Sequence, residues 1–109
     1  MSDAVLTALA DPTRRRIFEA LREGPDTVKG LAARQPVSRP AVSQHLKVLE
    51  QAGLAGVNPV GKRRFYYIRR EGLEQLREYV ESFWTDALSA YATEVERRVN
   101  SAAQNSTTV

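Results

Sequence analysis

The sequence predicts a mainly α-helical protein with one small β-hairpin, and three observations support this fold class. Apolar residues recur at helical spacing in several segments before residue 50 and again after residue 72. Residues 55–68 instead contain two short β-prone runs on either side of turn-forming residues. With 109 residues, the chain can bury one modest core and is too short for a second domain.

The N-terminal segments are predicted to support the fold. Val5, Leu6 and Leu9 mark a short amphipathic helix, which ends where Asp11 can cap a second helix with a proline at its first position. Arginines occupy positions 14–16, although a cation in the first turn opposes the helix dipole. We therefore favour structural partners for these arginines over phosphate contacts.

Two short helical segments with a break between them come next. Residues 27–34 are predicted to form a helix capped by Thr27, and residues 35–37 interrupt it. A second helix is predicted to start after its cap, Ser38, and to end at Gly53. This arrangement is a helix-turn-helix, in which the second helix enters the major groove of DNA.

The second of these helices has two distinct faces. Val42, Leu46 and Leu49 form an apolar stripe that must face a core, whereas the opposite stripe is polar. Serine hydroxyl and glutamine amide groups can hydrogen-bond base edges, and flanking cations can hold phosphates. The residues of this helix that we expect to contact DNA are Ser38, Arg39, Pro40, Ser43, Gln44 and Lys47.

A basic hairpin is predicted after this helix. Residues 55–58 and 65–68 read as two antiparallel strands, with turn chemistry at residues 59–61. The basic residues at the tip and at the start of the return strand are Lys62, Arg63 and Arg64. A hairpin projecting from the body can straddle a phosphate backbone, so it is a wing, and the whole is predicted to be a winged helix-turn-helix.

From Glu71 to about Val99 the sequence predicts one long helix with an aromatic stripe. So small a body cannot cover such a helix, and we expect it to pair with the same helix of a second chain. The residues expected in this dimer interface are Val5, Leu6, Leu9, Val80, Phe83, Trp84, Ala87, Leu88, Tyr91 and Val95. The domain would comprise residues 1–99, followed by a disordered tail at residues 100–109, which lack both charge and apolar periodicity.

The net charge of +3 is distributed unevenly along the chain. Residues 1–28 carry −1, residues 29–70 carry +8 and residues 71–109 carry −4. A basic middle between acidic ends is expected when one face of a protein meets a polyanion. The alternative is a merely solvated surface, but the basic stretch coincides with the helix-turn-helix and the wing.

Four short motifs stand out along the chain: DPTR at residues 11–14, VSQHLKVL at 42–49, AGL at 52–54 and GKRRFYY at 61–67. Together they resemble the ArsR family of bacterial winged-helix repressors, and the similarity covers about residues 4–95. The resemblance implies a symmetric dimer that binds an imperfect inverted repeat in a promoter, with release caused in many members by a metal or another inducer. We therefore expect a homodimeric cytoplasmic repressor whose partner is double-stranded DNA.

The residues argue against metal sensing of the usual kinds. ArsR-type metal sensors typically use cysteine thiolates, or histidine with carboxylates on the C-terminal helix. This chain has no cysteine and a single histidine, His45, which we expect to be packed or close to DNA. Carboxylates at positions 74, 78, 81 and 86 offer at most a weak hard-ion site. We expect no metal and no cofactor, and the inducer stays open.

Two other classes of function compete with DNA binding. A winged helix can dock an acidic protein partner instead, in which case it would show no sequence preference, but the basic wing disfavours this alternative. For an enzyme, only Ser43 and His45 suggest a catalytic pair, and two residues apart on a helix they point in different directions. We expect no catalysis, and the lack of a membrane-length apolar run predicts no membrane association.

Overall fold

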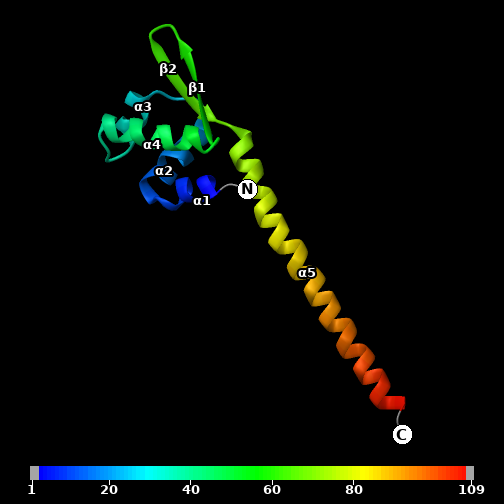
Figure 1. Ribbon diagram of the computed structural model, residues 1–109. Coiled ribbons are helices and arrows are strands. Elements are labelled where there is room, and N and C mark those ends of the chain that lie inside the picture. The colour runs from blue at the N-terminus through cyan, green and yellow to red at the C-terminus, as the bar shows by residue number, and fades with distance from the viewer. Residues whose placement is uncertain (1–2, 108–109) are drawn as a thin grey trace. The chain divides into compact units, whose positions relative to one another are not determined.

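The computed structural model describes residues 3–107, including the side chains of residues 3–104, and the chain divides into two units. The first unit extends to Arg77 and the second begins at Glu78. The elements in chain order are α1 (Asp3–Ala10), α2 (Pro12–Ala20), the short 3-10 helix η1 (Leu21–Glu23), α3 (Val28–Arg34), α4 (Arg39–Gln51), β1 (Ala55–Val60), β2 (Arg63–Ile68) and α5 (Arg70–Thr107). Figure 1 shows the hairpin extending from the small helices with its turn at the free end. The predicted fold class, a winged helix-turn-helix, is confirmed.

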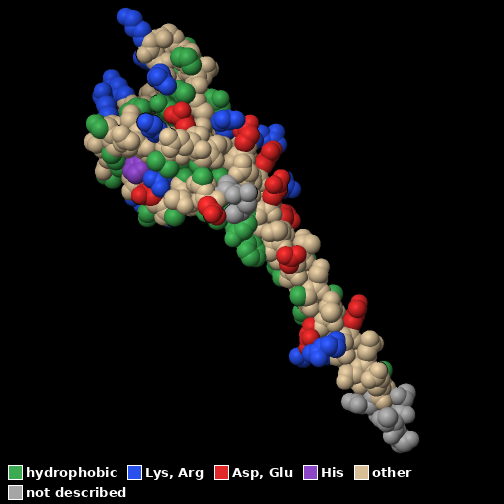
Figure 2. All heavy atoms as spheres, in the orientation of Figure 1, with side chains coloured by type: hydrophobic (Ala, Val, Ile, Leu, Met, Phe, Trp, Pro, Cys, Tyr) green, Lys and Arg blue, Asp and Glu red, His purple; other side chains and the backbone are tan. Residues whose placement is uncertain are grey.

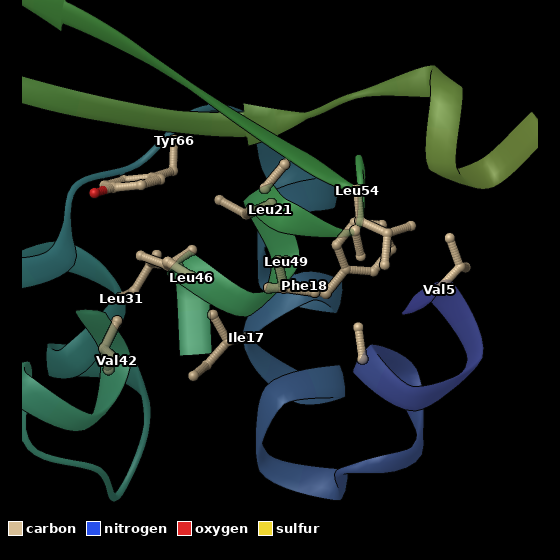
Figure 3. Close-up of a cluster of buried hydrophobic side chains, with 13 residues drawn as sticks. Val5, Ile17, Phe18, Leu21, Leu31, Val42, Leu46, Leu49, Leu54 and Tyr66 are labelled. Carbon is tan, nitrogen blue, oxygen red and sulfur yellow. The ribbon is translucent and has the colours of Figure 1, made fainter. Parts of the chain in front are cut away.

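A single apolar core holds the first unit together (Figure 3). Its buried members are Val5, Ala8, Ile17, Phe18, Leu21, Leu31, Val42, Leu46, Leu49, Ala52, Leu54, Ala55 and Tyr66. The predicted inward stripe of α4 is confirmed, because Val42, Leu46 and Leu49 are all fully buried. Truncating a leucine in such a core to alanine typically costs about 2–5 kcal/mol of stability, so this packing fixes which face of α4 points outward.

The predicted caps of the first helices are confirmed. Asp11 accepts a hydrogen bond from the amide of Arg14 at 2.9 Å, and this bond lowers the pKa of the Asp11 carboxyl. Thr27 Oγ1 accepts from the amide of Gly30 at 3.0 Å, and Ser38 Oγ accepts from the amide of Ala41 at 3.3 Å. Side-chain oxygens therefore satisfy amides at the N-termini of α2, α3 and α4 that have no partner inside their own helix.

The arginines at the start of α2 have structural partners, as expected. The Arg14 guanidinium donates from Nε to the carbonyl of Ala8 at 2.7 Å and from Nη2 to that of Thr7 at 3.1 Å. Arg15 Nη1 donates to the carbonyl of Leu9 at 2.9 Å. These carbonyls belong to the last turn of α1, where the helix dipole is negative, so the cations stabilise the end of the preceding helix.

The hairpin is longer than predicted. In the antiparallel register Ala55 pairs with Ile68, and the pairing continues through Pro59 and Arg64 to Val60 and Arg63. The expected turn at residues 59–61 is therefore wrong in its first two positions, since the turn consists of Gly61 and Lys62. Proline is tolerated in β1 because both strands of a two-stranded sheet have a free edge. Gly61 takes a φ of +61°, which allows a tight two-residue turn.

A single bridge fixes the base of the wing to the loop before α3. The amide of Asp26 donates to the carbonyl of Tyr66 at 3.0 Å, and the amide of Tyr66 donates back to the carbonyl of Asp26 at 2.8 Å. Arg34, at the end of α3, forms ion pairs with Asp26 and Glu23. The wing and the helix-turn-helix are thus connected by backbone hydrogen bonds as well as by the core.

A close backbone contact joins the end of α4 to the start of α5. Gly53 has a φ of +76°, and its carbonyl accepts a hydrogen bond from the amide of Gly72 at 2.9 Å. A Cβ atom added to Gly72 would lie 2.8 Å from that carbonyl oxygen. Only glycine fits at position 72 without movement of the backbone.

Two features of the helices predicted to form the dimer differ from expectation, namely the burial of Val5 in α1 and the length of α5. Val5 is 0% exposed and belongs to the core of its own chain, so its expected interface position is wrong. At the other end, α5 continues to Thr107 instead of ending near Val99. Residues 100–107 contain no glycine or proline, so nothing in the expected tail interrupts the helix. Residues 108 and 109 of that tail lie outside the described residues.

Candidate nucleic-acid interface

A groove with a volume of about 1090 Å³ lies between α3, α4 and the wing. Three parts of the chain line it: α3 with its capping residue, α4, and the wing. The lining residues are Thr27, Val28, Lys29, Gly30, Ala33, Arg39, Ser43, Lys47, Glu50, Lys62, Arg63, Arg64 and Tyr66. The backbone bridge between Asp26 and Tyr66 joins the wing to the loop before α3, and the shared apolar core joins both to α4.

The groove is strongly cationic. Its lining includes six lysine and arginine residues and one acidic residue, Glu50. Figure 2 shows lysine and arginine side chains at the tip of the wing and beside it, and acidic side chains along α5. No ion pair in the described part of the chain neutralises the cations of the groove. The groove is therefore suited to a polyanion.

Most of the predicted DNA-contacting residues meet in this groove. Arg39, Ser43 and Lys47 contribute one wall from α4, and the three basic residues at positions 62–64 contribute another from the wing. Three predicted residues are exposed but do not line the groove, namely Ser38, Pro40 and Gln44. They lie on the neighbouring stripe of α4 or at its start, so the outer surface of the helix is wider than the groove.

Seven groove residues were not predicted as DNA contacts from the sequence, and three of them carry a charge or an aromatic ring. Lys29 lies in the first turn of α3, Glu50 lies one turn after Lys47 on α4, and Tyr66 lies on β2. Helical spacing alone predicts Glu50, because it is seven residues after Ser43 and so shares its face. Lys29 and Tyr66 could not be predicted in this way, since their positions depend on how α3 and the hairpin pack against α4.

His45 is packed beside Arg14. Its ring is half-buried, and its Nδ1 atom lies 3.4 Å from Nη1 of Arg14. The sequence left open whether the His45 imidazole is packed inside the protein or lies close to DNA, and this geometry favours the packed position.

The described residues contain no group of three or more histidine, cysteine, aspartate or glutamate side chains that could hold a metal ion. Within the same residues, no helix has the length and hydrophobicity needed to cross a membrane.

Known proteins resemble this chain in both sequence and structure. A family model described as a helix-turn-helix domain matches residues 9–57. The HTH-type transcriptional regulator Rv2034 of Mycobacterium tuberculosis is 53% identical over 90 residues, which cover 83% of this chain and 84% of that protein. The transcriptional repressor SdpR of Bacillus subtilis is 30% identical over 79 residues, covering 72% of this chain and 88% of the relative.

Solved structures show the same relationship. An ArsR-like transcriptional regulator from Rhodococcus sp. RHA1 superposes with a TM-score of 0.67 at 32% identity, covering 80% of this chain and 85% of that one. The chain belongs to the ArsR family. A homodimeric winged helix-turn-helix domain of Mb0332 from Mycobacterium bovis, a possible ArsR-family regulator, gives a TM-score of 0.62 at 26% identity, covering 76% and 77% of the two chains.

This ArsR-family protein is thus a transcriptional regulator with a helix-turn-helix DNA-binding domain. The matched residues 9–57 run from the end of α1 through α4 into β1, and they contribute two of the three walls of the groove. The wing, which supplies the third wall, lies largely beyond that match.

Proposed function

We propose that this ArsR-family regulator is a homodimeric repressor that binds an inverted-repeat operator in double-stranded DNA. The observation that carries the proposal is the cationic groove shared by α3, α4 and the wing, next to the polar outer face of α4. Two similarities support the finer points: SdpR is a transcriptional repressor, and the Mb0332 domain is a homodimer. Because this role requires access to DNA, we place the protein in the cytoplasm.

We divide the residues of the groove and of the adjoining outer face of α4 into those that read bases and those that hold phosphates. We assign base contacts to Arg39, Ser43 and Gln44, because their exposed side chains occupy the half of α4 that would enter a major groove first. We assign phosphate contacts to Lys47 and to the basic residues at positions 62–64 of the wing, which flank that half.

Dimerisation is proposed to use the apolar stripe of α5. Trp84 is 64% exposed and Tyr91 is 70% exposed in the single chain, an unusual amount of aromatic surface for an isolated soluble protein. On α1, Leu6 is 37% exposed and Leu9 is half-buried, so both remain in the proposed interface, whereas Val5 does not. A two-fold dimer presents two identical copies of α4 and therefore selects an inverted repeat.

We also propose that regulation does not operate through a cysteine or histidine metal site. The chain has no cysteine, and its one histidine lies against Arg14, a poor environment for a cationic metal. Another kind of signal, or a change in protein concentration, would then control repression.

Selection of bound sequences from random double-stranded DNA tests the proposal. The purified protein is expected to enrich an inverted repeat with half-sites about one helical turn, or a multiple of it, apart. Enrichment of one asymmetric half-site would contradict the symmetric dimer. Absence of any enrichment, together with binding to an acidic protein, would support the alternative role as a protein-interaction module.

A further inference from the structure

Tyr66 occupies an unusual position for a core residue, because it also lines the cationic groove. The residue is 8% exposed and belongs to the apolar core. Strand alternation puts it on the same face of the hairpin as Val57, its cross-strand partner, whereas Tyr67 lies on the opposite face. Figure 3 shows the Tyr66 hydroxyl at the edge of the cluster, pointing away from the other labelled side chains. The ring is thus in the core and the hydroxyl is at the groove.

The Tyr66 hydroxyl has no hydrogen-bond partner among the described residues of the chain. Both backbone groups of Tyr66 are satisfied by the bridge to Asp26. Tyr66 as a whole is more than nine-tenths buried, and the hydroxyl of such a tyrosine normally has a hydrogen-bond partner. Since Tyr66 lines the groove and its hydroxyl points away from the core cluster, the groove is where a ligand can reach that hydroxyl.

We propose that the Tyr66 hydroxyl donates a hydrogen bond to a phosphate oxygen of the bound DNA. This inference rests on the proposed function, because it places the DNA backbone in the groove. Six cations line that groove, so an anion is the ligand it favours, and a phosphate oxygen is a strong acceptor for a neutral hydroxyl.

The position of Tyr66 makes it a fixed phosphate contact. Its ring is immobilised by the core and its backbone by two hydrogen bonds, so little conformational entropy is lost when the hydroxyl meets its partner. The exposed lysine and arginine side chains of the wing must be ordered on binding. Tyr66 would therefore set the distance between the DNA backbone and the wall of the groove, while the cations supply the attraction.

Replacing Tyr66 by phenylalanine removes the hydroxyl and keeps the ring. We expect Tyr66→Phe to weaken binding to operator and random DNA alike, by roughly tenfold for each subunit engaged. Because a neutral hydroxyl releases no counterion, the salt dependence of binding should stay unchanged. The melting temperature should not fall. The matched control is Tyr67→Phe, which removes a hydroxyl from the opposite face of the hairpin, at a residue that is 38% exposed, and should bind like the wild type.

Neutral methylphosphonates, introduced one at a time into the operator, identify the phosphate. The wild type should lose more affinity than Tyr66→Phe at one position in each half-site, and the two proteins should respond equally elsewhere. Equal responses at every position, or a melting temperature lowered by Tyr66→Phe, would show that the hydroxyl acts inside the protein and would overturn the proposal. Wild-type-like binding by Tyr66→Phe would also overturn it. Failure of the wild type to bind any DNA would instead overturn the proposed function.

Discussion

Gln44 is the residue whose proposed role depends most on base identity. It is exposed on the outer face of α4, and a glutamine amide can pair bidentately with adenine. We expect Gln44→Ala to lose about 1–3 kcal/mol of binding free energy on the selected operator and to relax preference at one base pair per half-site. Binding to random DNA should barely change. Titrations on both DNAs measure the difference, and an equal loss on both would reassign Gln44 to a phosphate.

Glu50 opposes the charge of the groove that it lines. It is the only acidic residue between positions 29 and 70, and no ion pair with it is found in the described part of the chain. A carboxylate in this position repels phosphates wherever DNA enters the groove, and so should lower affinity for sequences that offer no compensating base contact.

Glu50→Gln should therefore strengthen binding to random DNA by about threefold to tenfold at low salt, with a smaller gain on the operator. Glu19→Gln makes the same change of charge on an exposed position of α2 outside the groove and serves as the control. If Glu50→Gln instead weakened operator binding alone, the carboxylate would be accepting a hydrogen bond from a cytosine amino group.

The sequence predicts individual side chains well where one helix decides their environment. The caps at Thr27 and Ser38 and the buried stripe of α4 follow from local spacing, and all are confirmed. Tyr66 and Lys29 escape the same reasoning. Their place in the groove results from packing between segments that are up to about 40 residues apart, which periodicity does not describe.

At the scale of elements, the wing is expected to contribute affinity without selectivity. Arg63 and Arg64 begin β2 and line the groove, so both are suited to phosphates. The double variant Arg63→Ala/Arg64→Ala should weaken binding to operator and random DNA equally. It should also reduce the salt slope by roughly 0.9 for each phosphate that a subunit no longer neutralises.

The control for the wing is a pair of arginines on α5. Arg97 and Arg98 form ion pairs with Glu94 and do not line the groove, so Arg97→Ala/Arg98→Ala removes the same charge without changing the groove lining. The control should leave the salt slope unchanged. A wing variant that lost sequence preference while retaining its salt slope would reverse the assignments of the wing and the recognition helix.

The boundaries of elements were predicted less well than their existence. Proline normally ends a strand because it has no amide hydrogen to donate, so the sequence predicts the turn to begin at Pro59. In a two-stranded ribbon each strand has a free edge, and Pro59 can therefore lie within β1, paired with Arg64. The end of α5 was misjudged for a related reason. Residues 100–107 lack an amphipathic pattern, which argues against packing but does not stop a helix that is already propagating.

For the whole molecule, we expect Trp84→Glu to produce a monomer. Trp84 lies in the middle of the exposed apolar stripe of α5, where a partner's helix would bury it. A charge there would have to be desolvated in the dimer. Sedimentation at micromolar concentration should give the mass of one chain, and operator affinity should fall because a monomer engages one half-site. Ser89→Glu, on the opposite face of α5, should remain dimeric. A dimeric Trp84→Glu protein would place the interface elsewhere.

Metal ions are expected to leave DNA binding unchanged. Zinc, cobalt, cadmium or arsenite, added at stoichiometric levels to the protein–operator complex, should not shift its affinity, because the chain lacks thiolates and has one histidine. The measurement is a binding titration after treatment with a chelator. Saturable release by any one of these species would show that carboxylates or His45 form a sensing site.

Exchanging the C-terminal helix for another oligomerisation module imposes a strict condition on where the two sequences are joined. The backbones of Gly53 and Gly72 touch, and a side chain at position 72 would collide with a carbonyl oxygen. A chimaera joined directly after Ile68 would therefore need to reproduce a glycine at the position equivalent to 72. Joining after Arg77, where the chain divides into its two units, keeps both glycines. The C-terminal helix can therefore be exchanged after Arg77 without disturbing the glycine contact, whereas a junction after Ile68 puts that contact at risk.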